Sequence, residues 1–212
     1  MRENLAASLR LLLVTDDALL GARDPVALTR EAVRGGVTAV QLRLKRASDR
    51  EVLDLARRLV AVLPVPLFVN DRLDIALVAG ASGVHLGGDD LPPERARRIA
   101  PQGFWIGASV GSAAEVARGL AADYWGIGPL HRTTTKGDAG AALGFGGAAA
   151  LLAAAGPRPC VLIGGVQPED VAPAIAAGFA GVAVVSGILG SEDVEGAARG
   201  FTPPPGLRPR AG

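Results

Sequence analysis

The sequence predicts a single (β/α)₈ barrel, an α/β fold in which eight parallel strands alternate with helices. Short runs rich in Val, Ile, Leu and aromatic residues alternate with longer helical patterns along the whole chain. Its 212 residues, 49% of them hydrophobic, are enough to bury a large core and fit one domain. Eight strand–helix units fit a compact barrel better than an open sheet. The first strand also lacks the G-x-G-x-x-G turn of dinucleotide-binding open sheets.

Eight segments carry the strand pattern, namely 9–15, 38–44, 66–70, 83–87, 104–109, 124–129, 159–165 and 181–186. Helical patterns lie between them, for example at 24–36, 49–63 and 168–178. Two of these begin with recognisable caps. Asp24 precedes Pro25, and Ser48 has Glu51 three residues further on. We therefore expect one barrel domain over 1–200.

Composition and charge exclude several classes of function. The formal net charge is +1 and aromatic residues are 4%, so neither nucleic acid nor an anionic membrane is an expected partner. No segment reaches the apolar length of a membrane span, and the N-terminal apolar run is too short for a signal peptide. The chain has a single cysteine, Cys160, and can form no internal disulfide, which suits a reducing cytoplasm. Cys160 lies in a segment with the pattern of a buried strand, which indicates a structural role. The Pro-rich segment 201–212 is expected to be a disordered tail without an assigned function.

The second strand presents an amide and two cations at alternate positions. Gln41, Arg43 and Lys45 point to one face if the segment is extended, with Ala39 deeper on the same face. In (β/α)₈ barrels the active site lies at the C-terminal ends of the strands. These side chains therefore belong to the predicted site.

Two aspartates end neighbouring strands of the predicted barrel. Asp71 follows the third strand and Asp90 follows the fourth. Magnesium prefers one or two carboxylates together with waters and substrate phosphates, so the pair indicates a Mg²⁺ site. The alternative is that each aspartate caps the helix that follows it. Asp89 is a close competitor of Asp90, and spacing does not separate the two.

Two further segments are suited to phosphate. After the sixth strand, Thr133, Thr135 and Lys136 offer two hydroxyls and an ammonium in a glycine-containing loop, which could also be an ordinary solvated loop. After the seventh and eighth strands lie Gly164-Gly165 and Val185-Ser186, where barrels commonly bind a phosphate through backbone N–H groups. The sequence thus predicts two anion sites, one of them with metal.

The two histidines do not form a recognisable metal or triad pattern. His85 lies inside a strand and is expected to be packed, while His131 lies in the loop after the sixth strand. Neither has a carboxylate or cysteine at ligand or triad spacing, so zinc chemistry and a hydrolase triad are poorly supported.

Several motifs occur together and in order. They are Q-x-R-x-K at Gln41–Lys45, N-D-R-x-D-I-A at Asn70–Ala76, G-V-H-L-G at Gly83–Gly87 followed by Asp90, IGAS ending at Ser109, GPLHRTTTK at Gly128–Lys136, and IGGV and VVS near the end. In these motifs the chain resembles the thiamine-phosphate synthase family, from about Val14 to Ile188.

The resemblance implies an enzyme, a transferase that joins hydroxymethylpyrimidine diphosphate to a thiazole phosphate and releases diphosphate. It implies that the pyrimidine diphosphate is held by Gln41, Arg43, Lys45, Asn70, Ser109 and Lys136, of which Arg43, Lys45, Ser109 and Lys136 would be catalytic. It implies Mg²⁺ on Asp71 and Asp90. It implies that Thr133, Thr135, Gly165, Val185 and Ser186 hold the thiazole phosphate. Small molecules are the expected partners, and a homo-oligomer is compatible with the sequence.

The chain departs from the family pattern at three places. Leu44 stands where the family usually has Glu, His131-Arg132 where it has an aromatic-Pro pair, and Gly88-Asp89 where it has Gln-Glu. Two alternative functions remain open at this point. One is a thiazole tautomerase-like isomerase, which typically has His where Pro129 stands. The other is a non-catalytic protein that binds thiamine precursors.

Overall fold

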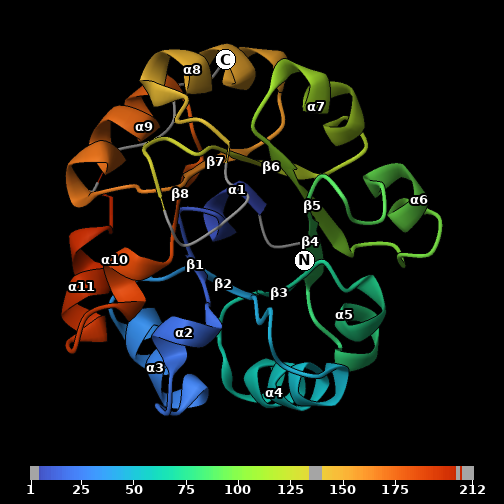
Figure 1. Ribbon diagram of the computed structural model, residues 1–212, viewed down its shortest axis with the longest axis vertical. Coiled ribbons are helices and arrows are strands. Elements are labelled where there is room, and N and C mark those ends of the chain that lie inside the picture. The colour runs from blue at the N-terminus through green and yellow to red at the C-terminus, as the bar shows by residue number, and fades with distance from the viewer. Residues whose placement is uncertain (1–4, 134–139, 204–205, 207–212) are drawn as a thin grey trace.

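In the computed structural model, which describes residues 5–133, 140–203 and 206, eight parallel strands close into a barrel (Figure 1). The strands are β1 Leu11–Val14, β2 Ala39–Leu42, β3 Leu67–Asn70, β4 Gly83–Leu86, β5 Trp105–Val110, β6 Tyr124–Ile127, β7 Cys160–Ile163 and β8 Gly181–Val184. They follow one another around the barrel in sequence order, and β8 pairs with β1 to complete it. The predicted (β/α)₈ barrel is confirmed, with one strand inside or nearly inside each predicted segment.

Helices surround the strands, and one short helix lies across the middle of the ring (Figure 1). The helices are α1 Leu5–Ser8, α2 Asp17–Leu20, α3 Pro25–Arg34, α4 Asp49–Val62, α5 Leu73–Ala79, α6 Pro93–Arg97, α7 Ala113–Gly119, α8 Gly144–Ala154, η1 Pro168–Asp170, α9 Val171–Ala177, α10 Ser186–Leu189 and α11 Val194–Gly200. The central helix is α1, and its Leu5 and Ala6 pack against the apolar residues inside the barrel.

The caps predicted for two helices are present. Asp24 accepts a hydrogen bond from Val26 N–H at the start of α3. At the start of α4, the Ser48 hydroxyl and the Glu51 carboxylate each accept the other's backbone N–H. The third predicted helix begins differently, as the 3₁₀ turn η1 before α9.

The barrel interior is apolar toward the N-terminal ends of the strands and polar at their C-terminal ends. The apolar part includes Phe68 and Tyr124, whose rings meet edge to face with centroids 5.3 Å apart. Gly107 makes room for the tyrosine, because a Cβ there would lie 2.2 Å from Tyr124 Cζ. Full burial of a ring such as Phe68 stabilises the fold by roughly 1.5–3 kcal/mol. The large rings therefore fill the part of the interior that lies away from the C-terminal mouth.

Cys160 is buried at the start of β7, as expected for a structural cysteine. Burial raises the pKa of its thiol to about 12.

Phe201, the first residue of the predicted tail, is buried, and the hydroxyl of Thr202 donates to Gly35 O at 3.2 Å. The rest of that tail, apart from residues 203 and 206, lies outside the described residues. In the part of the chain that is described, no helix is long and apolar enough to cross a membrane.

Candidate active site

A cavity of about 410 Å³ opens at the C-terminal ends of the strands. Eight of the residues predicted for the site line it, namely Gln41, Arg43, Asn70, Ser109, Thr133, Gly165, Val185 and Ser186. A second cavity of about 1000 Å³ shares Arg43, Thr133, Gly165 and Ser186 with the first and is also lined by Lys45. The predicted residues Thr135 and Lys136 lie outside the described residues. The described residues predicted for the two anion sites thus line cavities at one mouth, except Asp71 and Asp90, which line neither cavity.

Arg43 is held at this mouth by residues that follow β1. The strand β2 ends at Leu42, and the Thr15 hydroxyl then accepts Arg43 N–H at 2.8 Å and donates to Arg43 O at 3.1 Å. The guanidinium lies 3.1 Å from the Asp16 carboxylate, and the two side chains are only 13% and 15% exposed. The sequence alone does not indicate a site role for Asp16, because its partner Arg43 lies 27 residues further along the chain.

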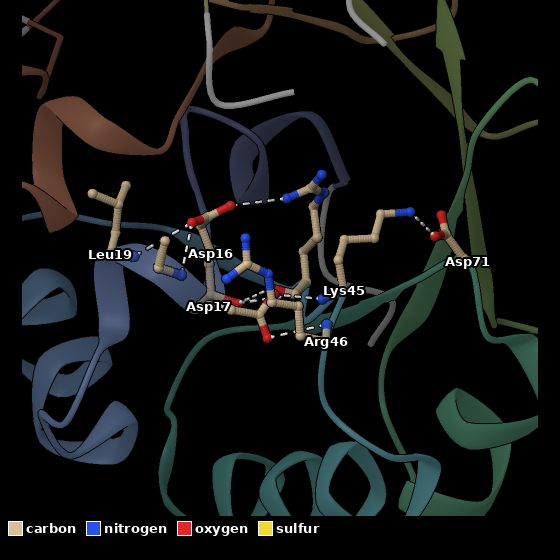
Figure 2. Close-up of polar contacts among 9 residues, drawn as sticks. Asp16, Asp17, Leu19, Lys45, Arg46 and Asp71 are labelled. Carbon is tan, nitrogen blue, oxygen red and sulfur yellow. Dashed lines mark hydrogen bonds and ion pairs between the residues drawn. The ribbon is translucent and has the colours of Figure 1, made fainter. Parts of the chain in front are cut away.

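Lys45 reaches the site from a loop rather than from the strand itself. Asp17 accepts the backbone N–H of Lys45 at 2.6 Å and that of Arg46 at 3.4 Å. Figure 2 shows the Lys45 side chain extending from this loop to Asp71, and its ammonium lies 2.6 Å from the Asp71 carboxylate. Ala39 and Gln41 share a face inside the barrel, as predicted. Lys45 lies beyond the end of β2, so the loop held by Asp17, and not the alternation of side chains along a strand, sets the direction of its side chain.

Asp71 and Asp90 face one another beside Lys45. Asp71 directly follows β3, and its backbone N–H donates to His85 O at 2.8 Å. It is the only non-glycine residue with a positive φ (64°) in the described part of the chain. Such a backbone is unfavourable for a side chain and is often retained at functional sites. The Asp90 carboxylate accepts Gly87 N–H at 2.6 Å and a hydrogen bond joins it to Asp71.

The paired carboxyl groups carry opposite pKa shifts. Burial, followed by the hydrogen-bonded Asp71 carboxylate, raises the pKa of Asp90 to about 6. Burial also acts to raise the pKa of Asp71, but the hydrogen bonds from Asp90 and Lys45 outweigh it and hold this pKa below its usual value. Two carboxylates this close repel each other unless a proton or a cation lies between them.

The helix-cap interpretation of the two aspartates is wrong. The N-cap residues of α5 and α6 are Arg72 and Pro92, and no side chain caps either helix. Asp89, the competitor of Asp90, is exposed, whereas Asp90 turns inward toward Asp71. In the described residues no group of three or more His, Cys, Asp or Glu side chains forms a metal cluster. A pair of carboxylates is a donor set that suits Mg²⁺ when water and substrate phosphates complete its coordination.

A chain of polar side chains crosses the barrel interior, and three of its members, Gln41, His85 and Ser109, line the cavity. His85 Nδ1 lies 3.0 Å from the Tyr124 hydroxyl, and His85 Nε2 lies 3.1 Å from the Ser109 hydroxyl. Gln41 also hydrogen-bonds to Tyr124, whose pKa is raised chiefly by burial. His85 is packed, as predicted, but it also fixes Ser109. Tyr124 was not expected in the site, because it reads as an ordinary core aromatic in the sequence.

The glycine pair after β7 lies against the start of the loop that follows β6. Gly164 and Gly165 have φ values of 92° and 68°, and a Cβ on Gly165 would lie 2.9 Å from His131 Cβ. The backbone N–H of His131 donates to Gly164 O at 2.9 Å. The sequence shows no carboxylate at ligand or triad spacing from His131. In the structure, His131 Nε2 lies 3.0 Å from the buried carboxylate of Asp170, which is 39 residues away in the chain. This pair joins the two loops that border the predicted thiazole phosphate site.

Fold and site together define a (β/α)₈-barrel protein whose mouth combines fixed cations, a carboxylate pair and a glycine loop suited to phosphate. The family model described as thiamine monophosphate synthase matches residues 11–188, and the chain belongs to this family. The chain is 45% identical over 194 residues to a thiamine-phosphate synthase of Methanoculleus marisnigri, covering 89% of this chain and 92% of that protein. It is 45% identical over 196 residues to a thiamine-phosphate synthase of Azorhizobium caulinodans, covering 90% and 92%.

A solved structure agrees with this assignment. The thiamine phosphate pyrophosphorylase of Pyrococcus furiosus superimposes with a TM-score of 0.81 at 36% identity, covering 93% of this chain and 96% of that one. The resemblance found in the motifs is confirmed over nearly the same residues. The chain is accordingly an enzyme of the transferase class.

Proposed function

We propose that this protein is a thiamine-phosphate synthase. It joins 4-amino-5-hydroxymethyl-2-methylpyrimidine diphosphate to a thiazole phosphate and releases thiamine phosphate and diphosphate. The observation that carries the proposal is the meeting of two anion-binding regions at one mouth. Arg43, Lys45, Gly165 and Ser186 line one cavity, and the Lys45 ammonium lies 2.6 Å from the Asp71 carboxylate of the aspartate pair. Two phosphorylated substrates need such an arrangement.

The chemical step breaks one bond and forms another. The bond between the pyrimidine methylene carbon and the diphosphate oxygen breaks, and its electron pair leaves with the diphosphate. The pyrimidine amino group stabilises the methylene cation that remains, and the thiazole nitrogen then donates its lone pair to this carbon. Arg43 and Lys45 stabilise the charge that develops on the departing diphosphate. This step needs no nucleophile from the protein.

The neutral polar side chains orient the pyrimidine. Gln41, Asn70 and Ser109 line the cavity, and the hydroxyl of Ser109 is fixed by His85. Holding the methylene carbon and the thiazole nitrogen in line converts a bimolecular encounter into a positioned one. We assign the thiazole phosphate to Thr133, Thr135, Gly165, Val185 and Ser186, and a further diphosphate contact to Lys136.

Asp71 and Asp90 would hold Mg²⁺ in this proposal. The ion would neutralise diphosphate oxygens as the leaving group departs. Support comes from the donor chemistry, because the two carboxylates lie together, and burial and the neighbouring Asp71 carboxylate raise the pKa of Asp90 to about 6. We also place the enzyme in the cytoplasm, where the unpaired, buried Cys160 is compatible with reducing conditions.

Incubation with both substrates, with and without Mg²⁺, tests the proposal. We expect thiamine phosphate, measured by chromatography after oxidation to a fluorescent product, only when Mg²⁺ is present. A tautomerase would convert the thiazole phosphate alone, and Pro129 stands where that isomerase typically has His. A precursor-binding protein would bind both compounds without turnover. Either result would overturn the proposed reaction, and turnover unchanged by excess chelator would overturn the metal site.

A further inference from the structure

The loop that carries Asp90 is held by one arginine of α7. Arg118 Nη2 donates to Gly87 O at 2.8 Å and to Asp90 O at 2.5 Å, and its Nη1 donates to Gly88 O. Arg118 does not line either cavity at the barrel mouth. Its three hydrogen bonds are all made to carbonyls of the Gly87–Asp90 loop.

Inside the loop, the Asp90 carboxylate accepts Gly87 N–H at 2.6 Å, but the rest of the loop backbone has few internal constraints. Gly87 and Gly88 have no side chain that could restrict the backbone, and Gly88 and Asp89 are exposed. The backbone hydrogen bond inside the loop, from Asp90 N–H to Gly87 O, is 3.4 Å long and correspondingly weak. A guanidinium is a planar, rigid set of donors, so a single Arg118 side chain can fix three carbonyls at once.

We propose that Arg118 is a positioning residue of the metal site: it holds the Gly87–Asp90 loop so that the Asp90 carboxylate faces Asp71 in a geometry that binds a divalent cation. This inference rests on the magnesium site of the proposed function. Residues that orient metal ligands from outside the coordination sphere typically change metal affinity by about 10–100-fold when they are replaced. Loss of Arg118 frees three carbonyls, and the Asp90 carboxylate then spends less time beside Asp71.

The chain offers a matched control. Arg158 also donates to three backbone carbonyls, those of Ala122, Ala155 and Leu120, at 2.8, 2.9 and 2.8 Å. It precedes β7 and so lies at the opposite end of the barrel from the mouth. Arg158→Ala therefore removes the same kind and number of hydrogen bonds as Arg118→Ala without touching the Asp90 loop.

The test titrates Mn²⁺, a paramagnetic substitute for Mg²⁺, into the metal-free protein and follows free Mn²⁺ by electron paramagnetic resonance. We expect Arg118→Ala to raise the Kd for Mn²⁺ by about 10–100-fold, and Arg118→Lys to raise it less, because an ammonium keeps the charge but cannot span three carbonyls. Arg158→Ala should leave the Kd within about twofold of wild type. In turnover, Arg118→Ala should raise the KM for Mg²⁺, and saturating Mg²⁺ should restore most of kcat.

The outcomes distinguish this inference from the proposed function. If Asp90→Ala abolishes Mn²⁺ binding while Arg118→Ala and Arg118→Lys bind as wild type does, the role of Arg118 is refuted and the metal site stands. If wild type and Asp90→Ala bind Mn²⁺ equally, the metal site itself is refuted. If Arg158→Ala weakens binding as much as Arg118→Ala, a general loss of stability explains both, and the positioning role is refuted.

Discussion

Gly165→Ala should damage the protein in two separable ways. Gly165 has a φ of 68°, and a side chain in this left-handed region costs about 1–2 kcal/mol of stability. The new Cβ would also lie 2.9 Å from His131 Cβ and 3.2 Å from Arg132 O, a close contact that forces the start of the β6 loop to move. Overpacking of this kind adds about 1–3 kcal/mol. Moving His131 also displaces the loops that border the proposed thiazole phosphate site.

Gly156→Ala is the matched control. Gly156 has a φ of 61°, but a Cβ there would have no atom within 4 Å. Urea unfolding should therefore show a loss of about 1–2 kcal/mol for Gly156→Ala and a clearly larger loss for Gly165→Ala. In steady-state kinetics, only Gly165→Ala should raise the KM for the thiazole phosphate, by about tenfold or more if 1.4 kcal/mol of binding is lost. The KM for the pyrimidine diphosphate should change much less.

Equal stability losses in the two variants would show that the contact with His131 is not made. A Gly165→Ala enzyme with unchanged KM for both substrates would separate this loop from phosphate binding. A KM increase of the same size for both substrates would refute the two-site arrangement.

Four further predictions follow from the described contacts. Asp90→Ala should lower Mg²⁺-dependent turnover on the order of 10²-fold, whereas Asp89→Ala should leave it nearly unchanged, with circular dichroism confirming that both are folded. Arg43→Ala should raise the KM for the pyrimidine diphosphate by about tenfold and that for the thiazole phosphate much less. Asp170→Ala should lower the free energy of unfolding, measured in urea, by about 1–3 kcal/mol, because it leaves Gln167 N–H without its buried acceptor. At about pH 8, Cys160 should react with iodoacetamide only after unfolding, as mass spectrometry would show, since the thiolate is the reactive form.

The sequence predicts the strands and the position of the site because both depend on local patterns. Short apolar runs define each strand, and the barrel rule then places Gln41, Arg43 and Asn70 at one mouth. The family motifs add residue assignments such as Ser109, which no local pattern would single out. Helix ends are also local, which is why the cap at Ser48 could be read directly.

The contacts that position the site residues could not be predicted from the sequence, because they join residues far apart in the chain. Asp16 with Arg43, His131 with Asp170, and Arg118 with the Asp90 loop all depend on which helix lies beside which loop. The sequence does not distinguish Asp90 from Asp89 for the same reason. Both carboxylates have similar spacing from the strand, and it is Asp90 that turns back onto Gly87 N–H, in a loop that Arg118 contacts from α7.

The pairing of β8 with β1 has a consequence for how the protein is made. Leu11, Leu12 and Leu13 find their last strand partners at Val182, Ala183 and Val184, near the end of the chain. During synthesis at about 5–20 residues per second, the edge of β1 waits roughly 10–30 s for β8 to leave the ribosome. An unpaired parallel edge over an apolar interior favours aggregation. The nascent chain therefore has its greatest need of chaperone protection after its first strands are made and before its last one emerges.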